Sequence, residues 1–199
     1  MKSIRILTAV LLSALLALTT IAPVHAARVY NPDTNSWEEP VVRQSTAGGM
    51  RYTPIPRQIV DYETSLKPGS LVIETGERRL YLVLEDGKAL RYGIGVGREG
   101  FTWSGRNTIT RKAEWPGWTP PPAMRKRIPD LPAYMEGGPD NPLGARALYI
   151  GSTLYRVHGT SEPWTIGHAV SSGCIRLTND DVIDLYERVR VGAVIVVNH

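Results

Sequence analysis

The chain has 199 residues, of which 42% are hydrophobic and 21% are charged, and its formal net charge is +4. A single cysteine excludes a fold built on disulfides, and four histidines with that cysteine do not form a metal-ligand set at usable spacing. No run of Lys and Arg alternates with aromatic residues, which excludes a nucleic-acid surface. We therefore expect one domain with an ordinary core, no cofactor and no nucleic-acid partner.

The first 26 residues have the pattern of a secretory signal. Lys2 and Arg5 precede an apolar run from Ile6 to Ala22, and small side chains lead to Ala26. Cleavage after Ala26 removes two cations and no acid, so the formal net charge falls from +4 to +2. A retained anchor is the alternative, but the run is short for a bilayer span of about 20 residues. We expect export to the periplasm or cell envelope, with no stable membrane anchor after signal removal.

Residues 27–57 are rich in Pro, Asn, Ser, Thr and Gly and have little hydrophobic periodicity. This composition predicts a linker or a loosely docked N-terminal segment. The folded domain is expected to span residues 58–199.

Three short segments rich in β-formers come next: Leu71–Thr75, Leu80–Leu84 and Ala89–Val96. Gly76–Arg78 separates the first two, and Asp86-Gly87 separates the last two. Glycine supplies the positive φ that a two-residue hairpin turn needs. The pattern predicts an antiparallel meander of three strands rather than a buried helix.

Residues 101–146 concentrate proline and tryptophan, which argues against a central strand or a long helix. We interpret them as an extended lid or ligand-contacting loop. The alternative is a structural excursion whose tryptophans cover the core. The residues concerned are Trp103, Trp115, Trp118, Pro116, Pro120, Pro121, Pro122, Pro129, Pro132, Pro139 and Pro142.

The C-terminal part predicts a hairpin, a helix and a last strand. Ala147–Ile150 and Leu154–Val157 form the hairpin, whose second strand ends at His158. Thr178 stands three residues before an acid, a pattern typical of the start of a helix. Apolar residues then recur at helical spacing. Ala193–Val197 reads as a final buried strand. The fold is therefore expected to be mainly β with one short late helix.

Cys174 is the candidate nucleophile. An exported cysteine without a partner in its chain either forms a disulfide bond with another chain or remains a free, reactive thiol. His158, upstream at a strand end, can take the thiol proton and lower the thiol pKa. A backbone carbonyl such as that of Gly159 can fix the imidazole tautomer, since no Asp or Asn adjoins the histidine. His168 is a rival base, in what reads as a loop.

Residues beside Cys174 have supporting assignments. The amides of Gly173 and Cys174 can bind a developing oxyanion. Arg176, two residues on in an extended segment, points to the same side as the thiol and suits a substrate carboxylate. Ser172 and Gly159 are the remaining candidates for shaping the oxyanion site or orienting the histidine.

Three segments together resemble the signature of YkuD-type L,D-transpeptidases: Tyr155–Thr160, Ile166-Gly167 and Ser171–Leu177. That signature is His-Gly or His-Ser, a short spacer, and Ser/Thr-His-Gly-Cys followed by an apolar residue and Asn or Arg. The similarity extends through residues 71–96 and 141–144 and covers most of the chain from Leu71 to Val197. Ser172 stands where the family usually has histidine, a departure that bears on loop geometry and rate more than on reaction class.

The resemblance implies a β-sandwich catalytic domain that acts on peptidoglycan stem peptides. Cys174 would attack the amide between the L-centre of meso-diaminopimelate and the following D-alanine. His158 would serve as base and acid, and Arg176 would hold a donor carboxylate. An amine would then resolve the thioester, supplied by a second stem, a D-amino acid or a lysine of an envelope protein.

Several alternatives stay open at this point. The same acyl-enzyme resolved by water gives an L,D-carboxypeptidase or another hydrolase. Papain-like enzymes and sortases differ in the order or the spacing of Cys and His. The non-enzymatic interpretation is a module that binds the cell wall and whose thiol is inert.

Overall fold

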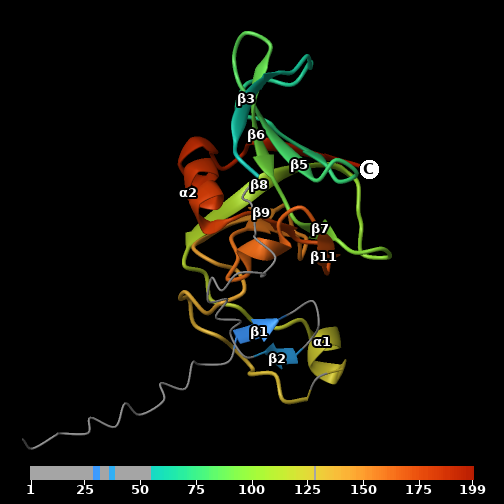
Figure 1. Cartoon of the computed structure of the whole chain (residues 1–199), viewed down its shortest axis with the longest axis vertical. Coiled ribbons are helices and arrows are strands. Elements are labelled where there is room, and N and C mark those ends of the chain that lie inside the picture. The colour runs from blue at the N-terminus through green and yellow to red at the C-terminus, as the bar shows by residue number, and fades with distance from the viewer. Residues whose placement is uncertain (1–28, 32–35, 39–54, 128) are drawn as a thin grey trace, which may run out of the picture.

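The computed structural model describes residues 29–31, 36–38, 55–127 and 129–199, and Figure 1 shows their arrangement. The expected signal segment and most of the expected linker lie outside these residues. Within the linker, β1 (Val29–Asn31) and β2 (Ser36–Glu38) form an antiparallel pair. No helix in the described ranges is both long enough and apolar enough to cross a membrane.

Nine strands form one mixed sheet in the order β12-β10-β9-β8-β13-β4-β5-β6-β3. In chain order they are β3 (Gln58–Asp61), β4 (Leu71–Glu74), β5 (Arg79–Val83), β6 (Lys88–Gly93), β8 (Gly105–Glu114), β9 (Arg146–Ile150), β10 (Arg156–His158), β12 (Ile175–Arg176) and β13 (Val194–Asn198). Within this sheet, β10–β12 and β4–β13 are parallel pairs. A separate small sheet pairs β7 (Val96–Gly97) with β11 (Ala169–Ser171).

Strands from both halves of this order contribute to one buried cluster. Leu80 and Tyr92 come from β5 and β6, while Val157 and Ile175 come from β10 and β12, and each is at most 2% exposed. Burying such a side chain contributes about 1.5–3 kcal/mol. Because residues so distant in strand order join one cluster, the sheet curves around a shared core. The prediction of a mainly β sandwich is confirmed.

The predicted meander is present as β4, β5 and β6, paired antiparallel. Asp86 and Gly87 both have positive φ, at 56° and 64°, as a two-residue hairpin turn of the primed type requires. The third strand ends at Gly93, earlier than predicted, and Val96-Gly97 pairs with β11 in the small sheet instead.

The interpretation of residues 101–146 as one lid was wrong for Gly105–Glu114. These residues form β8, a central strand paired with β9 and β13. Within residues 101–146 the first proline is Pro116. The overall proline content of this segment therefore misrepresented the proline-free residues 105–114. A second helix, α1 (Pro122–Arg127), was also missed. It begins with a proline, which is suited to the first turn because its missing N–H has no helical partner there.

The C-terminal predictions are confirmed. β9 and β10 form the hairpin, and β13 is the last strand. α2 (Asn179–Arg188) begins after Thr178, whose hydroxyl accepts a hydrogen bond from the amide of Asp181 at 3.2 Å. This capping bond satisfies one of the amides that the first helical turn leaves without a partner.

Candidate active site

The parallel pairing of β10 with β12 determines which side chains meet. Val157 lies opposite Ile175, and both are buried in the core. Side chains alternate along a strand, so the neighbours of these two residues face the other side of the sheet. His158, which ends β10, and Cys174, which precedes β12, are therefore brought to the same face.

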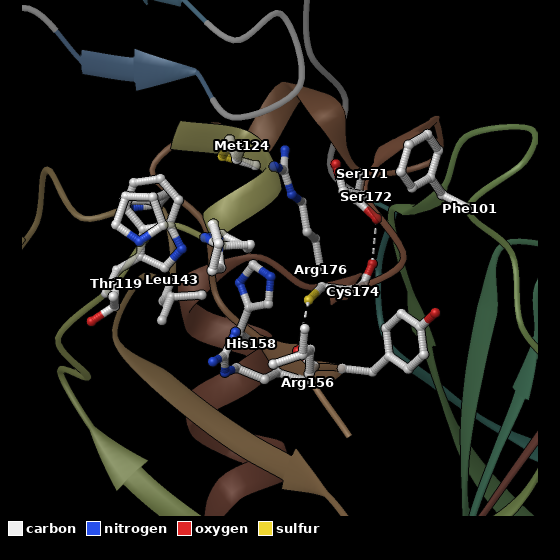
Figure 2. A pocket seen from close by; sticks show the side chains of 17 residues that line it. Phe101, Thr119, Met124, Leu143, Arg156, His158, Ser171, Ser172, Cys174 and Arg176 are labelled. Atoms are coloured by element: carbon white, nitrogen blue, oxygen red, sulfur yellow. Dashed lines mark hydrogen bonds between the residues drawn. The ribbon is translucent and has the colours of Figure 1, made fainter. Parts of the chain in front are cut away.

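Both side chains line one cavity of about 490 Å³, shown in Figure 2. The floor comes from β10 and from the loop before β12. The opposite wall comes from Trp118, residues 119–122 and Met124, with Pro142 and Leu143. The Pro/Trp-rich segment after β8 thus contributes a wall of the cavity. Trp118 also packs with Met124 and Leu143 in a small buried cluster, as the alternative of a core-covering tryptophan expected. The role of this segment as a lid or ligand-contacting loop stays a prediction.

The imidazole of His158 is buried and oriented by its own backbone neighbour. Nδ1 lies 2.5 Å from the carbonyl oxygen of Gly159. A carbonyl oxygen only accepts, so Nδ1 carries the proton and donates it. That leaves Nε2 as the nitrogen that can take a proton. The contact is the one that the sequence suggested for the Gly159 carbonyl, and the role of this carbonyl in fixing the tautomer stays a prediction.

The surroundings of His158 disfavour its charged form. Burial, followed by the charges of Arg176 and Arg156, lowers the pKa of His158 to about 3. Hydrogen bonding to the backbone of Gly159 and Leu143 acts in the opposite direction and is outweighed. The imidazole is therefore neutral near pH 7, as a general base must be.

Cys174 is a free, partly buried thiol whose pKa is raised above its ordinary value. Burial is the largest cause, and the charge and hydrogen bonding of Arg156 oppose it. The sequence had led us to expect a lowered thiol pKa in a thiolate–imidazolium pair, and the direction is the reverse. Burial penalises the charged form of each side chain, so the neutral forms of both are favoured.

The loop before Cys174 is braced by Ser171. Its hydroxyl donates to the carbonyl of Cys174 at 2.6 Å and accepts from the amide of Gly173 at 3.1 Å. The Gly173 amide, a predicted oxyanion donor, is thus already committed to this hydroxyl. Sequence reasoning had picked Ser172, which lines the cavity, and had missed this role of Ser171.

Gly173 has the backbone geometry that only glycine adopts readily, with φ at 103°. A Cβ there would lie 2.5 Å from the Tyr155 ring and 2.9 Å from the Phe101 carbonyl oxygen. Trp103 donates from Nε1 to the Gly173 carbonyl at 3.1 Å and stacks on Tyr155, with ring centroids 4.9 Å apart. These two aromatic side chains hold this turn in place, a role that the sequence analysis did not assign to either of them.

Arg176 lies at the cavity wall but is almost fully buried. Its Nη1 lies 3.4 Å from Oε2 of Glu162, and both side chains are under 5% exposed. Its predicted contact with a substrate carboxylate stays a prediction, beside a structural ion pair that the sequence did not indicate.

Arg156 is the cavity residue that sequence reasoning overlooked. It lies two residues before His158 in β10, so the strand period places both on the same face, and it lines the cavity. This alternation of side chains along the strand was the sequence signal that could have identified Arg156. His168, the rival base, is exposed and is not among the residues that line the cavity. Within the described ranges, no group of three or more His, Cys, Asp or Glu side chains is placed to hold a metal ion.

The chain matches the YkuD family, described as the L,D-transpeptidase catalytic domain, over residues 68–197. The "Probable L,D-transpeptidase ErfK/SrfK" of Escherichia coli is 43% identical over 146 residues, which cover 69% of this chain and 46% of that protein. The chain thus spans less than half the length of this curated relative.

Two solved structures extend the comparison. A Brucella melitensis protein named a probable carnitine operon oxidoreductase is 46% identical, with a TM-score of 0.50 over 69% of this chain and 90% of that one. L,D-transpeptidase 3 of Mycobacterium tuberculosis, in complex with a faropenem-derived adduct, has a TM-score of 0.50 at 21% identity, covering 65% of this chain and 60% of that one. At that identity the likeness is one of fold. By the family match and the Escherichia coli relative, this chain belongs to the YkuD family of L,D-transpeptidase catalytic domains.

Proposed function

We propose that the protein is a cysteine acyltransferase that acts on peptidoglycan stem tetrapeptides as an L,D-transpeptidase. The observation that carries the proposal is that His158, which ends β10, and Cys174, which precedes β12, lie on the same face of this strand pair and line a single cavity. The family membership supplies the substrate class, and the expected export signal is consistent with action in the cell envelope.

In the first half-reaction Sγ of Cys174 attacks the carbonyl carbon between meso-diaminopimelate and D-alanine. As the S–C bond forms, the thiol proton moves to Nε2 of His158, because neither partner is charged beforehand. The amide of Cys174 is the donor that we assign to the oxyanion, since the Gly173 amide is held by Ser171. One such donor is typically worth about 3 kcal/mol in the transition state.

The C–N bond then breaks, and the imidazolium gives its proton to the nitrogen of D-alanine, which leaves. A thioester remains on Cys174. In the second half-reaction a neutral acceptor amine attacks the thioester, His158 takes an amine proton, and the S–C bond breaks. The imidazolium returns that proton to the sulfur, which restores the neutral pair.

A single experiment tests the proposal against the other activities. The protein without residues 1–26 is incubated with purified disaccharide-tetrapeptide, and products and intact protein are both followed by mass spectrometry. Cross-linked dimers and a protein adduct that is absent in Cys174→Ala support transfer. Tripeptide alone identifies a hydrolase, and no product with an unmodified thiol identifies a binding module.

A second incubation adds a lysine-containing peptide or a free D-amino acid as the competing amine. Products that carry the added amine identify the acceptor class. If none forms while stem dimers do, the acceptor is the second stem.

A further inference from the structure

We propose that Arg156 is the residue that receives a carboxylate of the donor peptide beside Cys174. This inference rests on the proposed function and names the part of the site that selects an anionic donor. It assigns to Arg156 the contact that the sequence had suggested for Arg176.

The two arginines of the cavity differ in the side chains that interact with their positive charges. The guanidinium of Arg176 is paired with the buried carboxylate of Glu162. Arg156 is instead half-buried, and its guanidinium carbon lies 5.2 Å from the ring centroid of Tyr149. A ring face attracts a cation but accepts none of the in-plane N–H bonds that match a carboxylate. In the part of the chain that the structure describes, Nε of Arg156 is buried without a hydrogen-bond acceptor.

The ionisable side chains that line the cavity favour the binding of an anion over that of a cation. Among the described residues that line it, the charged or titratable side chains are Arg156, Arg176, His158, Cys174 and Tyr155, and no Asp or Glu is present. Figure 2 shows the side chains of Arg156 and Arg176 extending in different directions from the His158–Cys174 pair. A donor carboxylate on the Arg156 side would therefore meet a cation that no acidic cavity residue competes for.

The position of Arg156 is fixed by neighbouring strands. Tyr149 of β9 lies opposite both Arg156 of β10 and Arg111 of β8. The Arg111 guanidinium carbon is 3.5 Å from the same ring centroid. The ring thus lies between two cations, and this stack limits the conformations of Arg156. Limiting them before the substrate arrives reduces the entropy lost on binding.

An anion bound at Arg156 would also act on the catalytic base. The charge of Arg156 is one of the causes that lower the pKa of His158. A carboxylate paired with the guanidinium offsets that charge, so the imidazole becomes a stronger base when a donor is bound. Recognition of the donor and activation of Cys174 are then coupled through one side chain.

The test compares two alkylating reagents of nearly equal size, anionic iodoacetate and neutral iodoacetamide. Each forms an S–C bond at Cys174 and releases iodide, and neither requires peptidoglycan chemistry. The ratio of their rates removes any change in thiol reactivity common to both. Arg156→Gln should lower the iodoacetate-to-iodoacetamide ratio about tenfold, the change that 1.4 kcal/mol of lost anion binding produces. A ratio within twofold of wild type would overturn the proposal.

Two further variants complete the experiment. Arg156→Lys keeps the positive charge but not the planar guanidinium, so its ratio should lie between those of wild type and Arg156→Gln. A ratio as low as in Arg156→Gln would show that the charge at this position is not what the reagent detects, against the proposal. Arg106→Gln removes a cation from an exposed strand position outside the cavity and should leave the ratio unchanged. A fall in Arg106→Gln as large as in Arg156→Gln would mean that net charge, not a site, sets the ratio.

Donor tetrapeptides with a free or an amidated diaminopimelate carboxylate then connect the site to turnover. Wild type should prefer the free acid in KM, and Arg156→Gln should lose that preference. If the rate ratio responds to Arg156 but no peptide is turned over, the anion site stands and the proposed function fails. If turnover occurs and the ratio does not respond, the proposed function stands and Arg156 is not the carboxylate contact.

Discussion

Val157 and Ile175 lie directly opposite each other in the parallel pair of β10 and β12, and both are completely or almost completely buried. Their packing fixes the register of the two strands, because a slip by one residue would bury the polar face and expose the apolar one. The same register presents His158 and Cys174 to the cavity. The placement of His158 and Cys174, the proposed base and nucleophile, therefore depends on the packing of these two core residues.

Replacing the sulfur should remove the chemistry and leave the fold intact. Cys174→Ala should form no thioester with tetrapeptide and no adduct with a carbapenem, as measured by intact mass. Its thermal midpoint should stay close to wild type, because the side chain is small and only partly buried. A carbapenem adduct that persists in Cys174→Ala would place the reactive nucleophile elsewhere.

The neutral resting pair predicts a particular pH profile for thiol alkylation. The pKa of His158 is lowered to about 3 and that of Cys174 is raised, so the neutral forms of both side chains are favoured near pH 7. The rate with iodoacetamide should therefore climb steadily through neutral pH and continue to rise above pH 9. A rate that is already level from pH 5 to 8 would contradict this, since a level rate is the mark of a preformed ion pair.

His158 should also make stability depend on pH. In the unfolded chain its pKa is near 6.5 and in the fold it is about 3, so only the unfolded state binds this proton between those values. The free energy of unfolding should hence be intact above pH 6.5 and fall as the pH drops toward 3, by roughly 1.4 kcal/mol per pH unit at most. Urea unfolding at pH 7 and pH 5 measures the loss, and His158→Gln should show a shallower dependence. Equal slopes in both proteins would mean that His158 is not buried in its neutral form.

The ion pair between Arg176 and Glu162 predicts a stability cost that a purely substrate-binding arginine would not have. Arg176→Ala leaves the Glu162 carboxylate buried without this partner and should cost about 3–5 kcal/mol in unfolding free energy. Arg176→Ala combined with Glu162→Gln should cost less than the two single changes added together. Denaturant titration of the four proteins measures this. Wild-type stability in Arg176→Ala, with weaker donor binding, would return the arginine to the substrate-contact role.

The sequence identified what is local and what is chemically distinctive. The Asp86-Gly87 turn and the Thr178 cap each leave a signature within a few residues, and the Cys174–His158 pair is marked by its distinctive residue types within one short block. The sequence did not identify features that depend on residues close in space but distant along the chain. β8 was hidden by prolines that follow it, and Ser171 gains its role only from the turn at Gly173. The strand period alone could have placed Arg156 on the same face as His158, but its position in the cavity depends on the pairing of β10 with β12 across a loop.

Gly173 should be sensitive to the smallest possible side chain. A methyl group there would meet the Tyr155 ring at 2.5 Å, and a φ of 103° is strained for any L-residue. Relief requires the turn to move, which shifts the sulfur and the Cys174 amide away from the scissile carbonyl. Gly173→Ala should therefore lower the acylation rate by about 100-fold or more, since misplacement by roughly 1 Å costs that much.

The comparison that isolates this effect uses Gly100→Ala, because Gly100 also has positive φ but no neighbour within 4 Å of a built Cβ. Both variants carry backbone strain, while only Gly173→Ala presses on the ring that stacks with Trp103. Stopped-flow acylation by a carbapenem should therefore slow in Gly173→Ala and stay near wild type in Gly100→Ala. Equal slowing in both would assign the loss to general destabilisation, whereas slowing in Gly173→Ala alone ties the reactivity of Cys174 to the geometry of its own turn.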